Sequence, residues 1–215
     1  MTLVQEKVRD DSATAGVGVG VAHTPEELYA FVRPDIAAAI WRRQPLPRFQ
    51  SWIDSLDPDR LPEARVTLRP EDARETITQI CDDSETPDCP ERETLINDAA
   101  ALTDIFAGLT QSRYLQLRFD VIANNACRKF HVDVVTARLV CTYRGTGTQY
   151  GIATDGSDPS RIFTVPTGAP ILLRGKLWPP RPDSGLVHRS PPIEGTGETR
   201  LLLVLDPVSN LDDDR

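Results

Sequence analysis

A series of short β-rich segments in the C-terminal half constrains the fold of this 215-residue chain most strongly. Each segment is rich in Val, Ile, Leu, Phe, Tyr or Thr, and turn residues such as Gly, Pro, Asn and Asp separate them. They cover residues 115–122, 127–145, 161–166, 169–175, 185–190 and 199–206. Because no helical periodicity interrupts them, they favour a β-sandwich or barrel over a doubly wound sheet.

The region before these segments has helical patterns. TPEELYAFV begins with Thr24 as a helix cap, Pro25 at the first helical position and Glu27 three residues after the cap, which together form a capping-box pattern. Four further helices are predicted, at DIAAAIWRR (35–43), FQSWIDSL (49–56), PEDARETITQI (70–80) and RETLINDAAALTDIFAGL (92–109). The last of these is the most clearly amphipathic.

The predicted class is therefore α+β, with a helical N-terminal half followed by a β-barrel. Residues 1–23 are interpreted as a flexible lead-in, because GVGVGV (16–21) matches neither a phosphate-binding loop nor a dinucleotide fingerprint. Residues 24–112 form the predicted helical region that packs on the barrel, and residues 113–206 form the barrel itself. The end of the chain, 207–215, is interpreted as an acidic tail.

The net charge of −8 is unevenly distributed. Residues 111–200 hold 12 Lys or Arg against 7 Asp or Glu, so this part is mildly basic in an otherwise acidic protein. The electrostatic field of this mildly basic region suits a small anionic ligand. Nucleic acid is not expected as a partner, because it normally binds a broader basic surface. The chain has no apolar run long enough to cross a bilayer and no signal-peptide pattern at its start, so we expect a cytoplasmic protein without a membrane partner. The sequence does not indicate whether the substrate is a small molecule or a protein, and it does not indicate the oligomeric state.

His131, Val132 and Asp133 suggest part of a metal site. On an extended strand the side chains of His131 and Asp133 point to the same face, as two ligands of one cation must. His188 follows 57 residues later in another β-rich segment, and two histidines with one carboxylate form the facial triad of non-haem Fe(II) oxygenases. The alternative is a His–Asp hydrogen bond on a sheet face, with His188 as an independent histidine.

Arg200 lies 12 residues after His188, at the start of TRLLLVLD. By strand parity it shares a face with Leu202 and Val204. An arginine in an apolar strand would be costly to bury alone, but its planar fork could bind the carboxylate of an acid.

The order HVD, then His, then Arg resembles the motif of the Fe(II)/2-oxoglutarate-dependent oxygenases over residues 113–206. The resemblance implies a double-stranded β-helix, also called a jelly roll or cupin-like fold. It also implies iron ligation by His131, Asp133 and His188, and binding of the distal carboxylate of 2-oxoglutarate by Arg200. The implied activity is hydroxylation, with Fe(II) and 2-oxoglutarate as cofactors.

CRKFHVD, TYRGTGT and the HRSPP segment more closely resemble the bacterial family of domain of unknown function 1826. Genes of that family often lie near zinc-responsive genes, which implies a link to metal homeostasis. The alternative function is therefore a non-catalytic protein that binds Zn(II).

Several other residues lie around this motif in the sequence. Tyr143 could donate a hydrogen bond to a cosubstrate carboxylate, or it could be a core tyrosine with a satisfied hydroxyl. Cys127 and Cys141 share the strand parity of His131. They are interpreted either as buried thiols or as ligands that favour zinc. Trp178 is expected either to form a lid over the pocket or to pin its loop to the barrel. Three arginines, Arg138, Arg144 and Arg189, are expected to point away from the metal.

Overall fold

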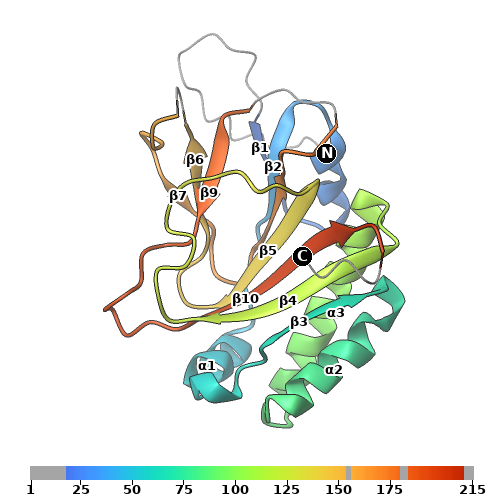
Figure 1. Ribbon diagram of the computed structural model, residues 1–215. Helices are drawn as coiled ribbons and strands as arrows, with labels where there is room; N and C mark the ends of the chain where they lie inside the picture. The colour runs from blue at the N-terminus through green and yellow to red at the C-terminus, as the bar shows by residue number, and fades with distance from the viewer. Residues whose placement is uncertain (1–17, 154–155, 180–183, 211–215) are drawn as a thin grey trace.

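The described part of the chain has an α+β fold with two β-sheets and three α-helices (Figure 1). The computed structural model describes residues 18–153, 156–179 and 184–210. The larger sheet has seven strands in the order β1-β2-β8-β5-β10-β4-β3. In chain order these strands are β1 (Gly18–Ala22), β2 (Ile36–Trp41), β3 (Ala64–Leu68), β4 (Tyr114–Ile122), β5 (Ala137–Arg144), β8 (Pro170–Arg174) and β10 (Arg200–Val208).

The larger sheet is mainly antiparallel. Only the pairing of β1 with β2 is parallel among its described neighbours. The smaller sheet is antiparallel throughout and has the order β7-β6-β9. Its strands are β6 (Gln149–Ile152), β7 (Phe163–Thr164) and β9 (Leu186–Arg189).

The helices lie on one side of the larger sheet, and the smaller sheet lies on its other side (Figure 1). The α-helices are α1 (Pro47–Ser55), α2 (Ala73–Asp83) and α3 (Pro90–Thr110), and the short 3-10 helices are η1 (Glu26–Val32), η2 (Pro58–Arg60) and η3 (Pro70–Asp72). The start of α3 follows the preference of proline for the first helical turn, where its missing N–H is not needed. None of the described helices combines the length and the apolar character that a membrane span needs.

The side chains of β10 alternate between two hydrophobic cores, one on each face of the larger sheet. Leu201, Leu203 and Leu205 pack into the core beneath the helices. Leu202 and Val204 pack on the other face, in the core shared with the smaller sheet. This alternation confirms the predicted parity of the strand and places Arg200 on the face toward the smaller sheet.

The N-terminal half is not helical throughout, because it contains β1, β2 and β3 as well as three α-helices within the described residues. The segment 35–43, predicted as a helix, contains β2, whose residues are buried on both faces between β1 and β8. A short continuous apolar run such as IAAAI has no periodicity that separates a buried strand from a helix. TPEELYAFV forms a 3-10 helix, while the other three predicted helices match α1, α2 and α3.

Two further expectations need correction. Residues 18–22 of the presumed flexible lead-in form β1, and residues 1–17 lie outside the described residues. The described strands form two open sheets and no closed barrel. At the other end, β10 extends to Val208, and residues 211–215 of the predicted acidic tail are outside the described residues.

Candidate metal centre

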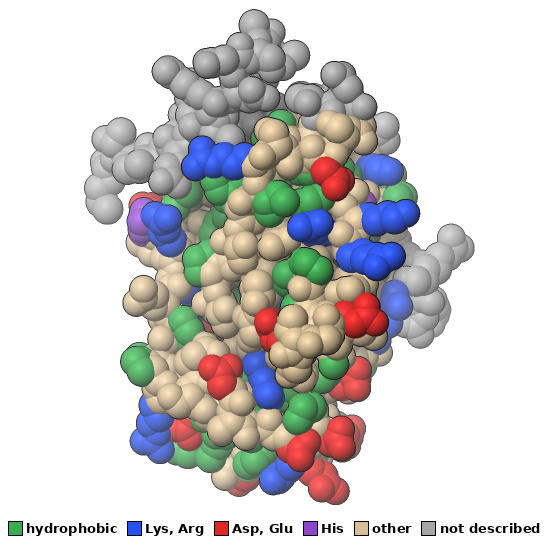
Figure 2. Space-filling view, turned by 90° about the vertical axis from the view of Figure 1, so that its left-hand side faces the viewer, with side chains coloured by type: hydrophobic (Ala, Val, Ile, Leu, Met, Phe, Trp, Pro, Cys, Tyr) green, Lys and Arg blue, Asp and Glu red, His purple; other side chains and the backbone are tan. Residues whose placement is uncertain are grey.

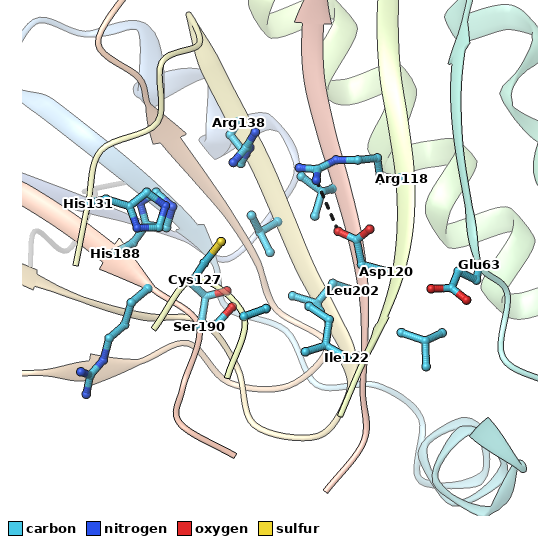
Figure 3. Close-up of a pocket in the computed structure, with 16 residues that line it drawn as sticks. Glu63, Arg118, Asp120, Ile122, Cys127, His131, Arg138, His188, Ser190 and Leu202 are labelled. Atoms are coloured by element: carbon cyan, nitrogen blue, oxygen red, sulfur yellow. Dashed lines mark ion pairs between the residues drawn. The ribbon is translucent and has the colours of Figure 1, made fainter. Parts of the chain in front are cut away.

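His131 and His188 are joined through their backbones. His131 lies between β4 and β5 in a single antiparallel bridge with His188 of β9, and each residue donates its N–H to the other's carbonyl oxygen over 3.0 Å. The two rings are side by side, with centroids 4.6 Å apart (Figure 3). The predicted long strand at 127–145 is thus one bridge followed by β5, and the bridge is what brings the two imidazoles together.

Asp133 completes the cluster of possible ligands. Its Oδ2 lies 3.0 Å from Nε2 of His188, and its Oδ1 lies 3.4 Å from Nε2 of His131. One ligand atom from each of the three residues lies within 4.8 Å of the others, which is close enough for one metal ion. The structure therefore brings together the three residues that the sequence singled out.

The imidazole of His131 is oriented for ligation. Its Nδ1 lies 2.8 Å from the carbonyl oxygen of Lys129, which can only accept a hydrogen bond. A proton therefore belongs on Nδ1, so that Nε2, on the side of Asp133 and His188, is the nitrogen that can bind a metal when the imidazole is neutral. A backbone carbonyl in this position is a common support for a metal-binding histidine.

The carboxylate of Asp133 is kept ionised. Burial acts to raise its pKa, but hydrogen bonds from His131 and His188 and the positive charge of Arg138 outweigh burial and hold the pKa well below its usual range. The hydrogen bond with Asp133 also raises the pKa of His131, against the opposing effect of burial. Asp133 Oδ2 is buried and lies 3.0 Å from Nε2 of His188. An ionised carboxylate beside two imidazoles suits a divalent cation.

Arg138 was expected to point away from this site, but it contacts it directly. Its Nη1 lies 2.6 Å from Asp133 Oδ1. Parity counted from His131 failed here because residues 132–136 do not form a regular strand and β5 begins only at Ala137. Counted within β5, Arg138 and Val140 face the cavity, and this signal could have identified the arginine.

Arg200 is fully buried without a carboxylate partner among the described ion pairs. Its Nε donates to the carbonyl oxygen of Thr146 over 2.6 Å, and Nη2 lies 3.5 Å from the hydroxyl of Thr142. Nη1 is buried and makes no hydrogen bond within the described part of the chain. Burial lowers the pKa of Arg200 to about 10, only partly offset by the charge of Glu198. A buried cation with a free donor fits an anionic ligand.

Tyr143 is not brought to the metal centre. It is buried in the core beneath the helices, and its hydroxyl donates to Oδ2 of Asp98 over 2.7 Å. Cys141 lies in the same core, where burial raises the pKa of its thiol to about 12. The alternative for Tyr143, a core tyrosine with a satisfied hydroxyl, agrees with these contacts.

A cavity of about 340 Å³ opens beside the two histidines. Figure 3 shows His131 and His188 at one side of it, with Arg118 and Asp120 of β4 and Glu63, just before β3, further across. Apolar side chains form much of the wall: Val121, Ile122, Ala126, Val140, Leu202 and Val204. The cavity therefore offers an apolar space next to the ligands, with charged groups at fixed positions around it.

Two residues near the site have clear places in the structure. Cys127 is exposed and lines the cavity. Trp178 packs edge-on against Phe31 at 5.0 Å and joins the core beneath the helices, so it pins its loop and does not line the cavity.

Charge on the surface that carries the smaller sheet is mixed. Basic side chains are frequent in the upper part of this face, and acidic side chains are frequent in its lower part (Figure 2). The expectation that the protein has no nucleic-acid partner stays a prediction.

The model of one protein family matches residues 22–206, and its description is "Protein of unknown function (DUF1826)". The match covers most of the chain, so the protein belongs to this family. A search of curated proteins gave no match.

The solved structures similar to this one include a rice dioxygenase for auxin oxidation, with 13% identity, a TM-score of 0.49, and coverage of 88% of this chain and 80% of that one. A second is the Arabidopsis thaliana dioxygenase for auxin oxidation 1 in complex with 2-oxoglutarate, with 9% identity, a TM-score of 0.48, and 95% and 92% coverage. A third is an oxidoreductase of the 2OG-Fe(II) oxygenase family from Burkholderia pseudomallei, with 15% identity, a TM-score of 0.47, and 89% and 95% coverage. Similarities this distant carry no functional conclusion by themselves.

Proposed function

We propose that this DUF1826 protein is a non-haem Fe(II)- and 2-oxoglutarate-dependent oxygenase that hydroxylates an organic substrate. The observation that carries the proposal is the convergence of His131, Asp133 and His188 on one point beside an apolar cavity. Two histidines and one carboxylate leave open positions on a metal, which is the arrangement that oxygenases of this type use. The two facing sheets are in keeping with a jelly roll, although they do not close into a barrel.

The three possible ligands fit Fe(II), and the unpaired donor of the buried Arg200 fits a carboxylate. Nε2 of each histidine and a carboxylate oxygen of Asp133 would hold Fe(II). The free Nη1 of Arg200 would bind the distal carboxylate of 2-oxoglutarate, which would add a second negative charge to that of Glu198 beside this buried cation. When bound, the iron and 2-oxoglutarate supply oxidative chemistry that converts 2-oxoglutarate and O₂ into succinate, CO₂ and an oxidised product.

The protein's own side chains perform the remaining tasks. The Lys129 carbonyl oxygen accepts a hydrogen bond from Nδ1 of His131, so the neutral imidazole presents Nε2 to the metal. Val140, Leu202 and Val204 keep the sheet side of the cavity apolar, which strengthens the charge interactions at the metal centre. In the proposed reaction, none of these side chains transfers a proton.

Succinate release tests the proposal. Protein purified without oxygen and mixed with Fe(II), 2-oxoglutarate and air is expected to form succinate, since uncoupled turnover without substrate is common in the oxygenases it resembles. His188→Ala should abolish the release, whereas Arg144→Lys should keep it, because Arg144 donates to the carbonyl oxygen of Leu56 on the helix side. Repeated absence of succinate from protein that holds iron would contradict the proposal.

Cys127 supports a second candidate, a non-catalytic Zn(II) protein that serves metal homeostasis. A thiol on the wall of the cavity that the two histidines line favours zinc over iron, because thiolates are preferred zinc ligands. Tight Zn(II) binding that weakens in Cys127→Ser, together with no succinate release, would select this function.

A further inference from the structure

Arg138 holds one of the two oxygens of Asp133. Its Nη1 lies 2.6 Å from Oδ1 of Asp133, while Oδ2 lies on the side of His188. Hydrogen bonds between a guanidinium and a carboxylate are short and directional, so they restrict the rotation of the carboxylate. The two oxygens of Asp133 are thereby made unequal.

Asp206 of β10 holds the other edge of the Arg138 guanidinium. Nε of Arg138 donates to Oδ1 of Asp206 over 2.7 Å, and Nη2 donates to Oδ2 over 2.6 Å. Asp206 is buried, and its Oδ2 also lies 3.6 Å from Nη2 of Arg118. Because the pair is bidentate and both residues are on neighbouring strands of the sheet, Arg138 cannot swing away with the carboxylate it contacts.

Asp133 Oδ2 has the opposite environment. It is buried and lies 3.0 Å from Nε2 of His188, whereas the ion pair with Arg138 is made by Oδ1. Oδ2 is the oxygen nearest to the imidazole of His188, whereas Oδ1 is the oxygen nearest to Nε2 of His131, at 3.4 Å. Occupation of Oδ1 by Arg138 therefore leaves Oδ2 to bind a metal.

We propose that Arg138, anchored by Asp206, is a positioning residue that makes Asp133 bind the metal through Oδ2 alone. This inference rests on the proposed metal site of His131, Asp133 and His188. One-oxygen ligation by Asp133 keeps an additional coordination position open for the cosubstrate or O₂. A purely structural role is less fitting, because β5 and β10 are already paired by backbone hydrogen bonds from Leu139 to Arg144.

Co(II), whose visible spectrum reports on its coordination, is the probe for this inference. Wild-type protein, Arg138→Lys and Asp206→Asn are titrated with Co(II), and affinity and spectrum are recorded. Lys keeps the charge but loses the fork that contacts both carboxylates, and Asn removes the anchor's charge. Both variants are expected to bind Co(II) about 10- to 100-fold more weakly, as for other residues that support metal ligands, and to show an altered spectrum.

Arg189→Lys is the matched control. Arg189 lines the same cavity next to His188, but its Nε donates to Gln149 over 2.8 Å and its guanidinium stacks over Phe130. This variant is expected to keep both the affinity and the spectrum of the wild-type protein.

Three outcomes would overturn the inference, and they are distinguishable. If wild-type protein does not bind Co(II), the proposed metal site fails and the role of Arg138 falls with it. If wild-type protein binds and the two variants bind equally well with the same spectrum, the metal site stands and only the positioning role fails. If the variants melt at a lower temperature but keep the wild-type spectrum, Arg138 is merely structural.

Discussion

At the scale of single residues, Arg200 is the side chain whose burial calls most clearly for a ligand. It is fully buried, and one of its nitrogens has no hydrogen-bond acceptor within the described residues. A buried charge without a counter-ion destabilises a fold, and replacement by an apolar side chain of similar volume often stabilises it. Replacement of Arg200 by an apolar side chain should therefore maintain or raise the stability of the protein but weaken ligand binding.

Arg200→Met is expected to leave the free energy of unfolding of the ligand-free protein unchanged or to raise it by about 1 kcal/mol. In the metal-loaded wild type, 2-oxoglutarate at about 100 times its dissociation constant should add about 2.7 kcal/mol, and this gain should be lost in the variant. Chemical denaturation with and without 2-oxoglutarate measures both effects. Strong destabilisation together with a retained response to 2-oxoglutarate would show that Arg200 only supports the fold.

Sequence patterns identified the potential metal ligands but misplaced their neighbours. His131, Asp133, His188 and Arg200 follow an order and spacing that can be read without coordinates. Arg138 and Tyr143 could not be placed this way, because face assignment by parity holds only along an unbroken strand. The irregular residues before Ala137 shift the count, so the expected outward arginine reaches Asp133 and the expected inward tyrosine lies beneath the helices.

At the scale of elements, β2 shows why local sequence was insufficient. Alanine favours helices, and the run of three alanines in IAAAI indicated one. In the fold, this segment lies between β1 and β8 and is buried on both faces, so tertiary pairing overrides the local preference. The long amphipathic pattern of α3, by contrast, was sufficient to predict that helix.

The turn after β8 supports the segment that carries Asp133. Gly175 donates its N–H to the carbonyl oxygen of Thr136, and Lys176 donates to that of Asp133 over 2.9 Å. A Cβ on Gly175 would lie 1.9 Å from the carbonyl oxygen of Val135, a backbone atom that cannot rotate away. The two backbone segments can approach this closely only because residue 175 is a glycine.

Gly175→Ala is therefore expected to displace residues 133–136, to destabilise the protein by about 2–3 kcal/mol and to weaken metal binding by about 10-fold or more. Gly20→Ala in β1 is the control, because its Cβ would make only ordinary contacts, the nearest 3.6 Å from Ile36. Thermal unfolding and metal titration of both variants check this. Wild-type metal affinity in Gly175→Ala would show that this turn does not position Asp133.

At the scale of the whole molecule, the N-terminal and C-terminal regions share one sheet. β1, β2 and β3 come from residues before 112, yet they form both edges of the sheet whose centre is β5 and β10. Helix α3 packs with β4 and β10 in the larger core. A division into a helical region and a separate β core thus separates strands that need each other for burial.

A fragment of residues 113–215 is expected not to fold by itself. It would lack both outer parts of the larger sheet and all three helices, which leaves the buried leucines of β4 and β10 in water. Circular dichroism and dispersion of NMR signals compare the fragment with the full chain. A folded fragment that binds metal would show that residues 113–206 are an independent unit after all.

The central claim is that one metal ion joins His131, Asp133 and His188 and that 2-oxoglutarate spans from it to Arg200. A crystal structure grown with 2-oxoglutarate and Zn(II), which does not react with O₂, tests this most directly. It should show Nε2 of both histidines and Oδ2 of Asp133 about 2.0–2.2 Å from one ion, with the distal carboxylate of 2-oxoglutarate on the guanidinium of Arg200. A metal bound elsewhere, or 2-oxoglutarate bound without contact to Arg200, would contradict the claim.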